Sequence, residues 1–312
     1  MKLSTPSKKN KIIFLFGPTA SGKTQLVEDF FSNGYEIINA DSVQVYRHLD
    51  IGSAKPSLEL LKKIKHYNVD ILDPWEQFTV GEFVKRSDEA VTQIYESGNI
   101  PLVTGGTAFY FKHFLYGLAE SPIADQGVRD KVKAMLDEKG VQELFKILKS
   151  VDPISAEKIN VNDAYRITRA LEVYYQTGRG LSSFAIPSTP RNNMKPLIIG
   201  LDRDRNELYE RIDKRVDIMF DEGLVDEIKK LCKMGASLAW PGIGGIGYRE
   251  FFDAKISGEA SIKIIKDNIK SASRHYAKRQ LTFFKSFDNV VWIHPDDKDK
   301  LKTILDNYLY SE

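Results

Sequence analysis

A buried-strand pattern that runs into a glycine loop and then a helix is the feature that most limits how this chain can fold. Residues Lys11–Phe16 read KIIFLF, an apolar run of the kind buried on both faces of a parallel sheet. The next residues, GPTASGKT at 17–24, match the P-loop pattern in full. Helical sequence then extends to about Asn33, where Gly34 marks the stop, and a second strand is predicted at Tyr35–Asn39. These elements make one βαβ unit.

The P-loop pattern predicts a phosphate site with a definite chemistry. Its glycines let consecutive backbone N–H groups turn inward around phosphate oxygens, at the positive end of a helix dipole. Lys23 adds a cation, and Thr24 places a hydroxyl where a phosphate-bound Mg²⁺ needs one. ATP, GTP and an isoprenoid diphosphate would all satisfy the pattern. The predicted phosphate-binding residues are Gly17, Pro18, Thr19, Ala20, Ser21, Gly22, Lys23 and Thr24.

Strand and helix patterns continue to alternate along the chain. Thr79-Val-Gly-Glu82 is a capping box that opens a helix reaching about Ser97. Further strands are predicted at Ile100–Thr104, Leu197–Leu201 and Val290–Ile293, and a long helix at Ile256–Phe284. This alternation predicts an α/β fold with a P-loop NTPase-like parallel sheet.

The stretch from Pro122 to Pro190 has a different character. It contains helical patterns but no convincing strand before the Ser- and Pro-rich loop 182–190. We therefore expect a helical insertion domain at 122–190 within a core formed by 10–121 and 191–312. The helical patterns lie at Val128–Lys139, Val141–Lys149 and Asp163–Thr177.

Composition excludes several classes of protein. No run of about 18 apolar residues is present, so no membrane span is predicted, and the N-terminus MKLSTPSKKN lacks the apolar region of a signal peptide. Cys232 is the only cysteine, which excludes an internal disulfide and a cysteine-based zinc site. The five histidines are scattered without metal-ligand spacing. We expect a cytoplasmic protein without a transition metal.

Asp41 follows the second predicted strand and is the main candidate for chemistry. Ligands of open α/β sheets bind beyond the carboxyl ends of the strands, and the P-loop and Asp41 are both expected there, on probable neighbouring strands. Asp41 could hold magnesium, like the carboxylate that often partners a P-loop, or act as a general base on an acceptor. Gly105-Gly106-Thr107, after another strand, could be a tight turn or part of the same site.

Read together, the motifs resemble bacterial tRNA dimethylallyltransferases. The resemblance covers nearly the whole chain in the order of that family. It includes GPTASGKT (17–24), DSVQVYRHLDIGSAKP (41–56), PLVTGGTAFYFK (101–112), PIADQGVR (122–129), NDAYRITRALEVYYQTG (162–178), IGYRE (246–250) and YAKRQLTFF (276–284). Two departures are mild: Gly127 stands where an acidic residue is usual, and Ser53 replaces the usual Thr of DIGTAKP.

The resemblance implies a reaction and its partners. Dimethylallyl diphosphate would donate its five-carbon group to N6 of adenosine-37, next to the anticodon, in tRNAs that read codons starting with U. Pyrophosphate would leave, with Mg²⁺ as cofactor and a monomer as the active form.

The resemblance also assigns roles to residues. Thr19 to Thr24 would hold the diphosphate, Asp41 would accept the proton from N6, and Arg215 would reach the diphosphate. The residues expected to contact the anticodon stem-loop of tRNA are Asp41, Ser42, Val43, Gln44, Thr107, Arg129, Tyr165, Arg166, Ile167, Thr168 and Arg169.

The basic residues have two interpretations each. Arg166 and Arg169 lie three apart on one helix and could bind RNA or simply face solvent. A stripe recurring every four residues in the last long helix could follow a phosphate backbone or form a charged face; it consists of Lys266, Lys270, Arg274 and Lys278. Arg215 is preferred to Arg211 as a catalytic residue, although either could pair with nearby acids. The roles of Arg279 and Gln280 stay open.

Three other functions fit parts of the sequence. A P-loop kinase would use Asp41 as base for a hydroxyl. An RNA-binding GTPase is disfavoured because no Asn-Lys-x-Asp motif is present. An enzyme that prenylates free AMP or ATP would not need the surface of a helical insertion.

Overall fold

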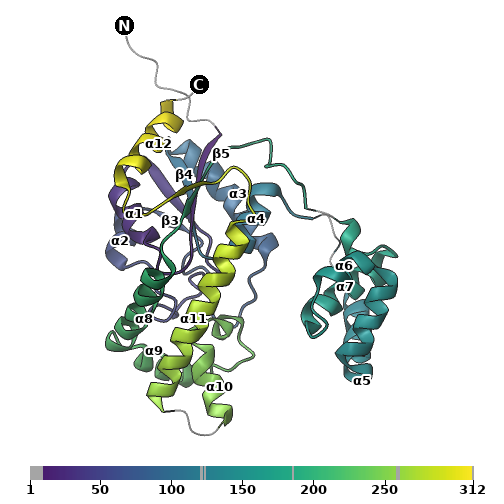
Figure 1. The fold of residues 1–312 in the computed structure, drawn as a ribbon. Coiled ribbons are helices and arrows are strands. Elements are labelled where there is room, and N and C mark those ends of the chain that lie inside the picture. Colours follow the sequence, from purple (N-terminus) through teal and green to yellow (C-terminus); the bar gives the residue numbers. More distant parts are fainter. Residues whose placement is uncertain (1–9, 120–121, 123, 185, 258–260, 311–312) are drawn as a thin grey trace. The chain divides into compact units, whose positions relative to one another are not determined.

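The computed structural model describes residues 10–119, 122, 124–184, 186–257 and 261–310. The chain divides into two compact units (Figure 1). The described residues of Met1–Leu115 and Pro190–Glu312 form the first unit, and those of Tyr116–Thr189 form the second. Among the described residues, none of the helices combines the length and apolar character needed to span a bilayer.

The first unit is built on a six-stranded, fully parallel sheet with the order β3-β2-β4-β1-β5-β6. Every residue of β1 and β4 is buried, as their apolar sequences predict. The predicted α/β class with a parallel sheet is confirmed. The strands are β1 (Lys11–Phe16), β2 (Tyr35–Asn39), β3 (His66–Tyr67), β4 (Ile100–Gly105), β5 (Lys195–Leu201) and β6 (Val291–Ile293).

The predicted adjacency of the first two strands is wrong. β4 lies between them, with Leu102 paired to Ile13 of β1 on one side and to Ile37 of β2 on the other. A strand with no polar side chain facing solvent is most stable in the interior of the sheet, and β4 takes that place. The P-loop and Asp41 are therefore one strand apart.

Helices cover both faces of the sheet (Figure 1). On one face, Leu26, Phe31 and Leu301 belong to an apolar core with side chains of the strands. On the other face, Phe16 stacks on Phe284 with ring centroids 4.2 Å apart. The helices of this unit are α1 (Lys23–Phe30), α2 (Leu58–Lys63), α3 (Val80–Glu96), α4 (Ala108–Tyr116), α8 (Arg205–Asp221), α9 (Leu224–Lys233), α10 (Arg249–Ser257), α11 (Ile262–Phe284) and α12 (Lys298–Tyr310), with a 3₁₀ turn η2 at Pro241–Gly244.

Helix ends follow local capping chemistry, which confirms one prediction and corrects another. Thr79 and Glu82 form the predicted capping box at the start of α3. The helix predicted at Ile256–Phe284 is in fact two helices. α11 begins at Ile262 because the Ser261 side chain caps it by accepting from the backbone N–H of Ile264. Residues 258–260 lie outside the described part.

The second unit consists of helices around its own apolar core. α5 (Gln126–Val151) is interrupted at Gly140, whose φ of 75° and ψ of 166° separate the two helical segments expected from the sequence. α6 (Pro153–Lys158), α7 (Ala164–Thr177) and a 3₁₀ turn, η1 (Leu181–Ser183), follow. The described residues of this unit contain no strand. Its core includes Val132, Leu144, Leu148, Ile167 and Leu171.

A buried carboxylate fixes the loop that follows the Asp41 segment. Glu227 of α9 accepts hydrogen bonds from the backbone N–H groups of Asp50 (3.1 Å), Ile51 (2.8 Å) and Gly52 (3.2 Å). It also accepts one from the Tyr248 hydroxyl at 2.7 Å. Because no helix or strand satisfies these amides, Glu227 does so from outside the loop.

We predict that Glu227→Ala lowers the free energy of unfolding by about 3 kcal/mol, because it leaves several buried donors without an acceptor. Urea denaturation followed by circular dichroism measures the change. Glu222→Ala, at an exposed neighbouring position, is the matched control and should change stability by less than about 0.5 kcal/mol. Equal stability of the two variants would contradict the role given to Glu227.

Candidate active site

A cavity of about 380 Å³ lies at the carboxyl ends of the strands in the first unit. It is lined by segments distant in sequence: the P-loop, the Asp41 segment, α8, α11 and the loop 244–247. The lining residues with polar side chains are Thr19, Lys23, Thr24, Asp41, Ser42, Gln44, Ser53, Arg215, Ser273, Tyr276, Arg279 and Gln280. The structure therefore brings the P-loop, Asp41 and Arg215 to one site.

The P-loop turns directly from β1 into α1. Gly22 caps α1 with a φ of 104°, a conformation that a residue with a side chain rarely adopts. Lys23 Nζ donates to the carbonyl oxygens of Gly17 and Pro18, each at 2.9 Å. Pro18 has no N–H, so it cannot donate to a phosphate. Of the eight residues predicted to bind phosphate, Thr19, Lys23 and Thr24 line the cavity.

Gln280 ties the P-loop to the end of β4. Its side-chain oxygen accepts from the Thr19 N–H at 2.9 Å, and its side-chain nitrogen donates to the Gly106 carbonyl at 2.7 Å. Gln280 is only 3% exposed. Sequence patterns alone assign Gln280 no role. Its position in the sequence did indicate that it is buried, because Gln280 lies on the face of α11 that otherwise buries Ile269, Ala277 and Phe284.

Asp41 is held in a fixed orientation. Its Oδ1 accepts from the backbone N–H groups of Val43 at 2.9 Å and Gln44 at 3.2 Å. Its Oδ2 makes no hydrogen bond within the described part of the chain. One oxygen thus orients the carboxylate, and the other is available to a ligand.

Thr107, in the turn between β4 and α4, supports the Asp41 segment without lining the cavity itself. Its hydroxyl accepts from the Ser42 N–H at 3.0 Å, and its own N–H donates to the Ala40 carbonyl at 3.0 Å. A Cβ on Gly105 would lie 2.3 Å from that carbonyl oxygen, so only glycine permits this approach. Gly106, the next residue, lines the cavity itself.

Burial and mutual repulsion destabilise the positive charges in the cavity. Burial, and then the neighbouring Arg215, lower the pKa of Lys23 to about 7, while Asp41 acts in the opposite direction. Burial also lowers the pKa of Arg215, and Asp41 again opposes the shift. Both cations would be stabilised by an anionic ligand.

The structure distinguishes Arg215 from Arg211. Arg215 lines the cavity, and no ion pair to it is found in the described part of the chain. Arg211 does not line the cavity, and its Nε donates to the Ala20 carbonyl at 2.9 Å. Of the two, Arg215 is the one placed to meet a ligand.

The donor set of the cavity fits Mg²⁺. The Thr24 hydroxyl and the Asp41 carboxylate both line it, and hard oxygen ligands of this kind suit magnesium together with oxygens of a bound phosphate. No zinc-type set of His and Cys side chains lines the cavity.

The predicted basic stripe of α11 is mostly neutralised within the protein. Lys266 and Lys270 form ion pairs with Asp217 of α8, at 2.8 and 2.7 Å. Arg274 pairs with Asp213 at 2.5 Å. The interpretation of these three as a track for a phosphate backbone is therefore disfavoured, because their charges attach α11 to α8. Lys278 is exposed.

In the helical unit, α7 presents some of the predicted RNA contacts and buries another. Tyr165 is 81% exposed, which is unusual for an aromatic side chain. Ile167 is fully buried in the core of the unit, so its side chain cannot contact an RNA, and its inclusion among the contacts is corrected. The members with some exposure are Arg129, Tyr165, Arg166, Thr168 and Arg169.

The parallel sheet, the glycine loop after β1 and the cavity at the strand ends define this chain as a P-loop α/β protein. Comparison with known proteins identifies the family. The model of the IPP transferase family matches residues 44–287, and that of the isopentenyl transferases matches residues 10–72. The chain belongs to the IPP transferase family.

Bacterial relatives match over almost their full length. A tRNA dimethylallyltransferase of Borrelia turicatae is 44% identical over 299 residues, covering 96% of this chain and 98% of the relative. One of Acetivibrio thermocellus is 40% identical, with 96% and 97% coverage. The solved tRNA isopentenylpyrophosphate transferase of Bacillus halodurans is 34% identical, with a TM-score of 0.68 and coverage of 96% and 97%. A eukaryotic dimethylallyltransferase shares the fold, with a TM-score of 0.78 at 24% identity.

We predict that pyrophosphate binding weakens above pH 7, by up to about tenfold per pH unit. Below pH 7 Lys23 already carries its proton. Above pH 7 the free protein must take up a proton before the charged lysine can meet the ligand. Calorimetric titrations with magnesium pyrophosphate, in buffers of different ionisation enthalpy, measure this uptake. Lys23→Met is the control, because any proton taken up or released when this variant binds comes from the ligand and not from Lys23. An identical pH dependence in both proteins would contradict the assignment.

Proposed function

We propose that this chain transfers a dimethylallyl group from dimethylallyl diphosphate to N6 of adenosine-37, beside the anticodon of a tRNA, and releases pyrophosphate. One observation carries the proposal. The P-loop, Asp41 and Arg215 line a single cavity in a chain that belongs to the IPP transferase family. In this proposal the substrates are tRNAs that read codons starting with U, and the active form is a monomer.

Asp41 is the general base of the proposed reaction. The N6 amine of adenine is a weak nucleophile because its lone pair is delocalised into the ring. Removing a proton as the C–N bond forms lowers the barrier. With Oδ1 held by two backbone amides, Oδ2 is free to accept that proton. The same amides keep the carboxylate oriented in the absence of substrate.

The second requirement is a stabilised leaving group. The allylic carbon tolerates positive charge, so the barrier depends chiefly on the charge that develops on the departing pyrophosphate. Lys23 and Arg215 line the cavity, and in this proposal they and the backbone amides of the P-loop stabilise that charge. Thr24 would hold Mg²⁺ together with diphosphate oxygens, and the ion would supply further neutralisation. In this assignment Arg215 and Lys23 gain charge stabilisation as the bond breaks.

The acceptor must leave its stack in the RNA to reach a buried donor. Ser42, Val43 and Gln44 line the cavity beside Asp41 and are the proposed contacts to the extruded adenosine. Gln44 is itself fixed, because its side-chain nitrogen donates to the carbonyls of Ser53 and Ala54, each at 3.1 Å. Exclusion of water from this pocket would protect the diphosphate from hydrolysis.

The proposal predicts that the purified protein converts unmodified tRNA and labelled dimethylallyl diphosphate to N6-prenylated adenosine without ATP. Nucleoside analysis of the digested tRNA detects the product. Asp41→Asn should still bind pyrophosphate, because the phosphate-binding residues are unchanged. Its turnover should be at least about 100-fold slower, because the general base is lost.

Other outcomes would contradict specific parts of the proposal. Prenylation of free AMP, but not of tRNA, would refute the acceptor. ATP consumption without prenyl transfer would indicate a kinase. Near-normal turnover by Asp41→Asn would rule out the general base.

We further propose that the exposed face of α7 binds the tRNA and predict that Arg166→Ala with Arg169→Ala weakens tRNA binding by about tenfold in moderate salt. Pyrophosphate affinity should be unchanged. Filter binding measures the first quantity and calorimetry the second. Lys146→Ala removes an exposed charge from the same unit and is the matched control. Unchanged tRNA affinity in the double variant would refute this role.

A further inference from the structure

Two arginines approach the P-loop from outside the cavity. Arg203, just before α8, donates from Nε to the Ser21 carbonyl at 3.0 Å. Arg211, two turns further along, donates from Nε to the Ala20 carbonyl at 2.9 Å. Neither residue lines the cavity. They therefore bind the carbonyl oxygens of two consecutive peptide groups of the P-loop from outside the cavity.

Arg203 is the more firmly held of the two. Its side chain is 5% exposed and bridges two carboxylates, Glu207 and Asp296. Nη2 donates to Asp296 Oδ1 at 2.7 Å, and Nη1 bonds to Glu207. A buried guanidinium paired on both sides has a fixed orientation, so its Nε–H points steadily at the P-loop.

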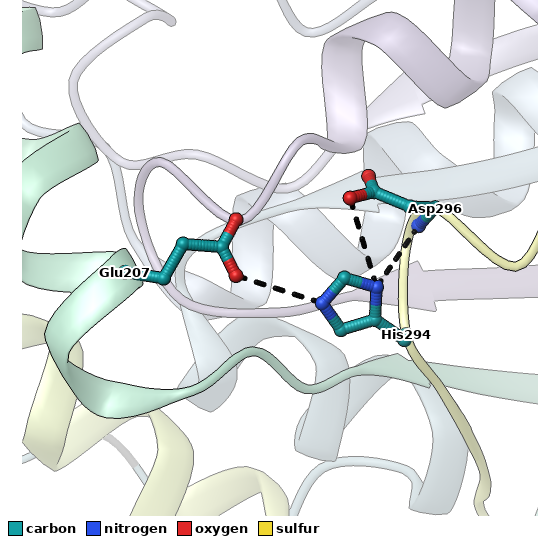
Figure 2. Close-up of side chains that lie close together, drawn as sticks. All are labelled: Glu207, His294 and Asp296. Carbon is teal, nitrogen blue, oxygen red and sulfur yellow. Dashed lines mark hydrogen bonds and ion pairs between the residues drawn. The ribbon is translucent and has the colours of Figure 1, made fainter.

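The two carboxylates belong to a cluster that resembles a metal site. Figure 2 shows Glu207, His294 and Asp296 with their side chains directed toward one another. His294 Nε2 lies 3.6 Å from Glu207, and His294 Nδ1 accepts from the Asp296 N–H at 3.3 Å. Arg203 already pairs with both carboxylates, and its positive charge opposes a bound cation. The cluster is better explained as the anchor of an arginine.

The contact to Ser21 acts on one particular peptide group. The carbonyl of Ser21 and the N–H of Gly22 belong to the same peptide unit, so a cation on the oxygen polarises the N–H. Gly22 is the N-cap of α1, where backbone N–H groups meet anions. A Cβ on Gly22 would lie 3.5 Å from Arg203 Nη2, so the guanidinium is packed against this peptide.

We infer that Arg203 is a positioning residue for the diphosphate. It holds the Ser21–Gly22 peptide with its N–H toward the cavity and strengthens that N–H as a donor to the phosphate. The inference rests on the proposed function, because it deepens the role of the P-loop as a cradle for the leaving pyrophosphate. Glu207 and Asp296 orient Arg203. Arg211 holds the preceding peptide, whose N–H belongs to Ser21 and donates to the Pro18 carbonyl at 3.2 Å.

The test is binding of magnesium pyrophosphate to the full chain, measured by calorimetry. Arg203→Met should weaken pyrophosphate binding by about tenfold, and its tRNA affinity should stay within about twofold of that of the unsubstituted protein. Arg205→Met is the matched control, because Arg205 is exposed two residues further along the chain and contacts Tyr209 instead of the P-loop. Asp296→Asn removes one charged partner of Arg203 and should weaken pyrophosphate binding by about threefold. Because Asp296 is exposed, this substitution leaves no buried cavity.

A spectroscopic readout separates this role from a purely structural one. Labelling serine carbonyls with ¹³C and glycine nitrogens with ¹⁵N selects Ser–Gly peptides, of which the sequence has three: Ser21–Gly22, Ser97–Gly98 and Ser257–Gly258. Loss of the hydrogen bond to the Ser21 carbonyl should move the Gly22 ¹⁵N resonance upfield. The Gly98 and Gly258 resonances should stay in place.

The outcomes are distinguishable. Failure of the original protein to bind pyrophosphate would refute the proposed function, whereas equal binding by the original protein and folded Arg203→Met would refute only this inference. If Arg203→Met does not fold, Asp296→Asn decides: unchanged affinity together with an unmoved Gly22 resonance would overturn the assignment. Thermal stabilisation of the original protein by Zn²⁺ or Mn²⁺ alone, lost in His294→Ala, would show that the cluster is a metal site and would contradict it.

Discussion

The close approach of β4 to its neighbours is the constraint on which the site depends. β4 lies between β1 and β2, so its carboxyl end separates the P-loop from Asp41. Gly105 lets the chain pass directly against the Ala40 carbonyl, and Gly106 leaves room for Gln280, whose amide nitrogen lies 2.7 Å from the position of a Cβ. Gln280 then bridges to Thr19 of the P-loop. A side chain at either glycine would push these groups apart, and the cavity would lose its shape.

The charges around this constraint form two layers. Inside the cavity, Lys23 and Arg215 repel each other and are only partly balanced by Asp41, so the site favours an anion. Outside it, Arg203 and Arg211 each donate from Nε to a carbonyl of the loop. The inner layer is left incompletely neutralised, which suits the diphosphate of the proposed function. In the outer layer Arg203 is neutralised by Glu207 and Asp296, as expected for a side chain that positions others.

Local sequence patterns predicted the elements close to the site. They failed where contacts between segments distant in the sequence determine the structure. The strand before the P-loop, the capping box at Thr79 and the interruption at Gly140 follow from nearest neighbours in the sequence. The two-residue strand β3 is too short for periodicity to indicate, and its place depends on pairing with β2. The basic stripe of α11 has the same spacing whether it binds RNA or α8. Only the position of Asp213 and Asp217 reveals that it binds α8.

The sequence by itself determined the fold class, the phosphate loop and the family of this protein, because glycine spacing and buried-strand patterns are local and the motifs keep their order. Only the tertiary structure decided that β4 lies between β1 and β2, that Arg215 lines the cavity while Arg211 binds the loop, and that Gln280 joins two strand ends. Spacing along a helix specifies which face a residue occupies, but it does not say what packs against that face. That information exists only once distant segments have met.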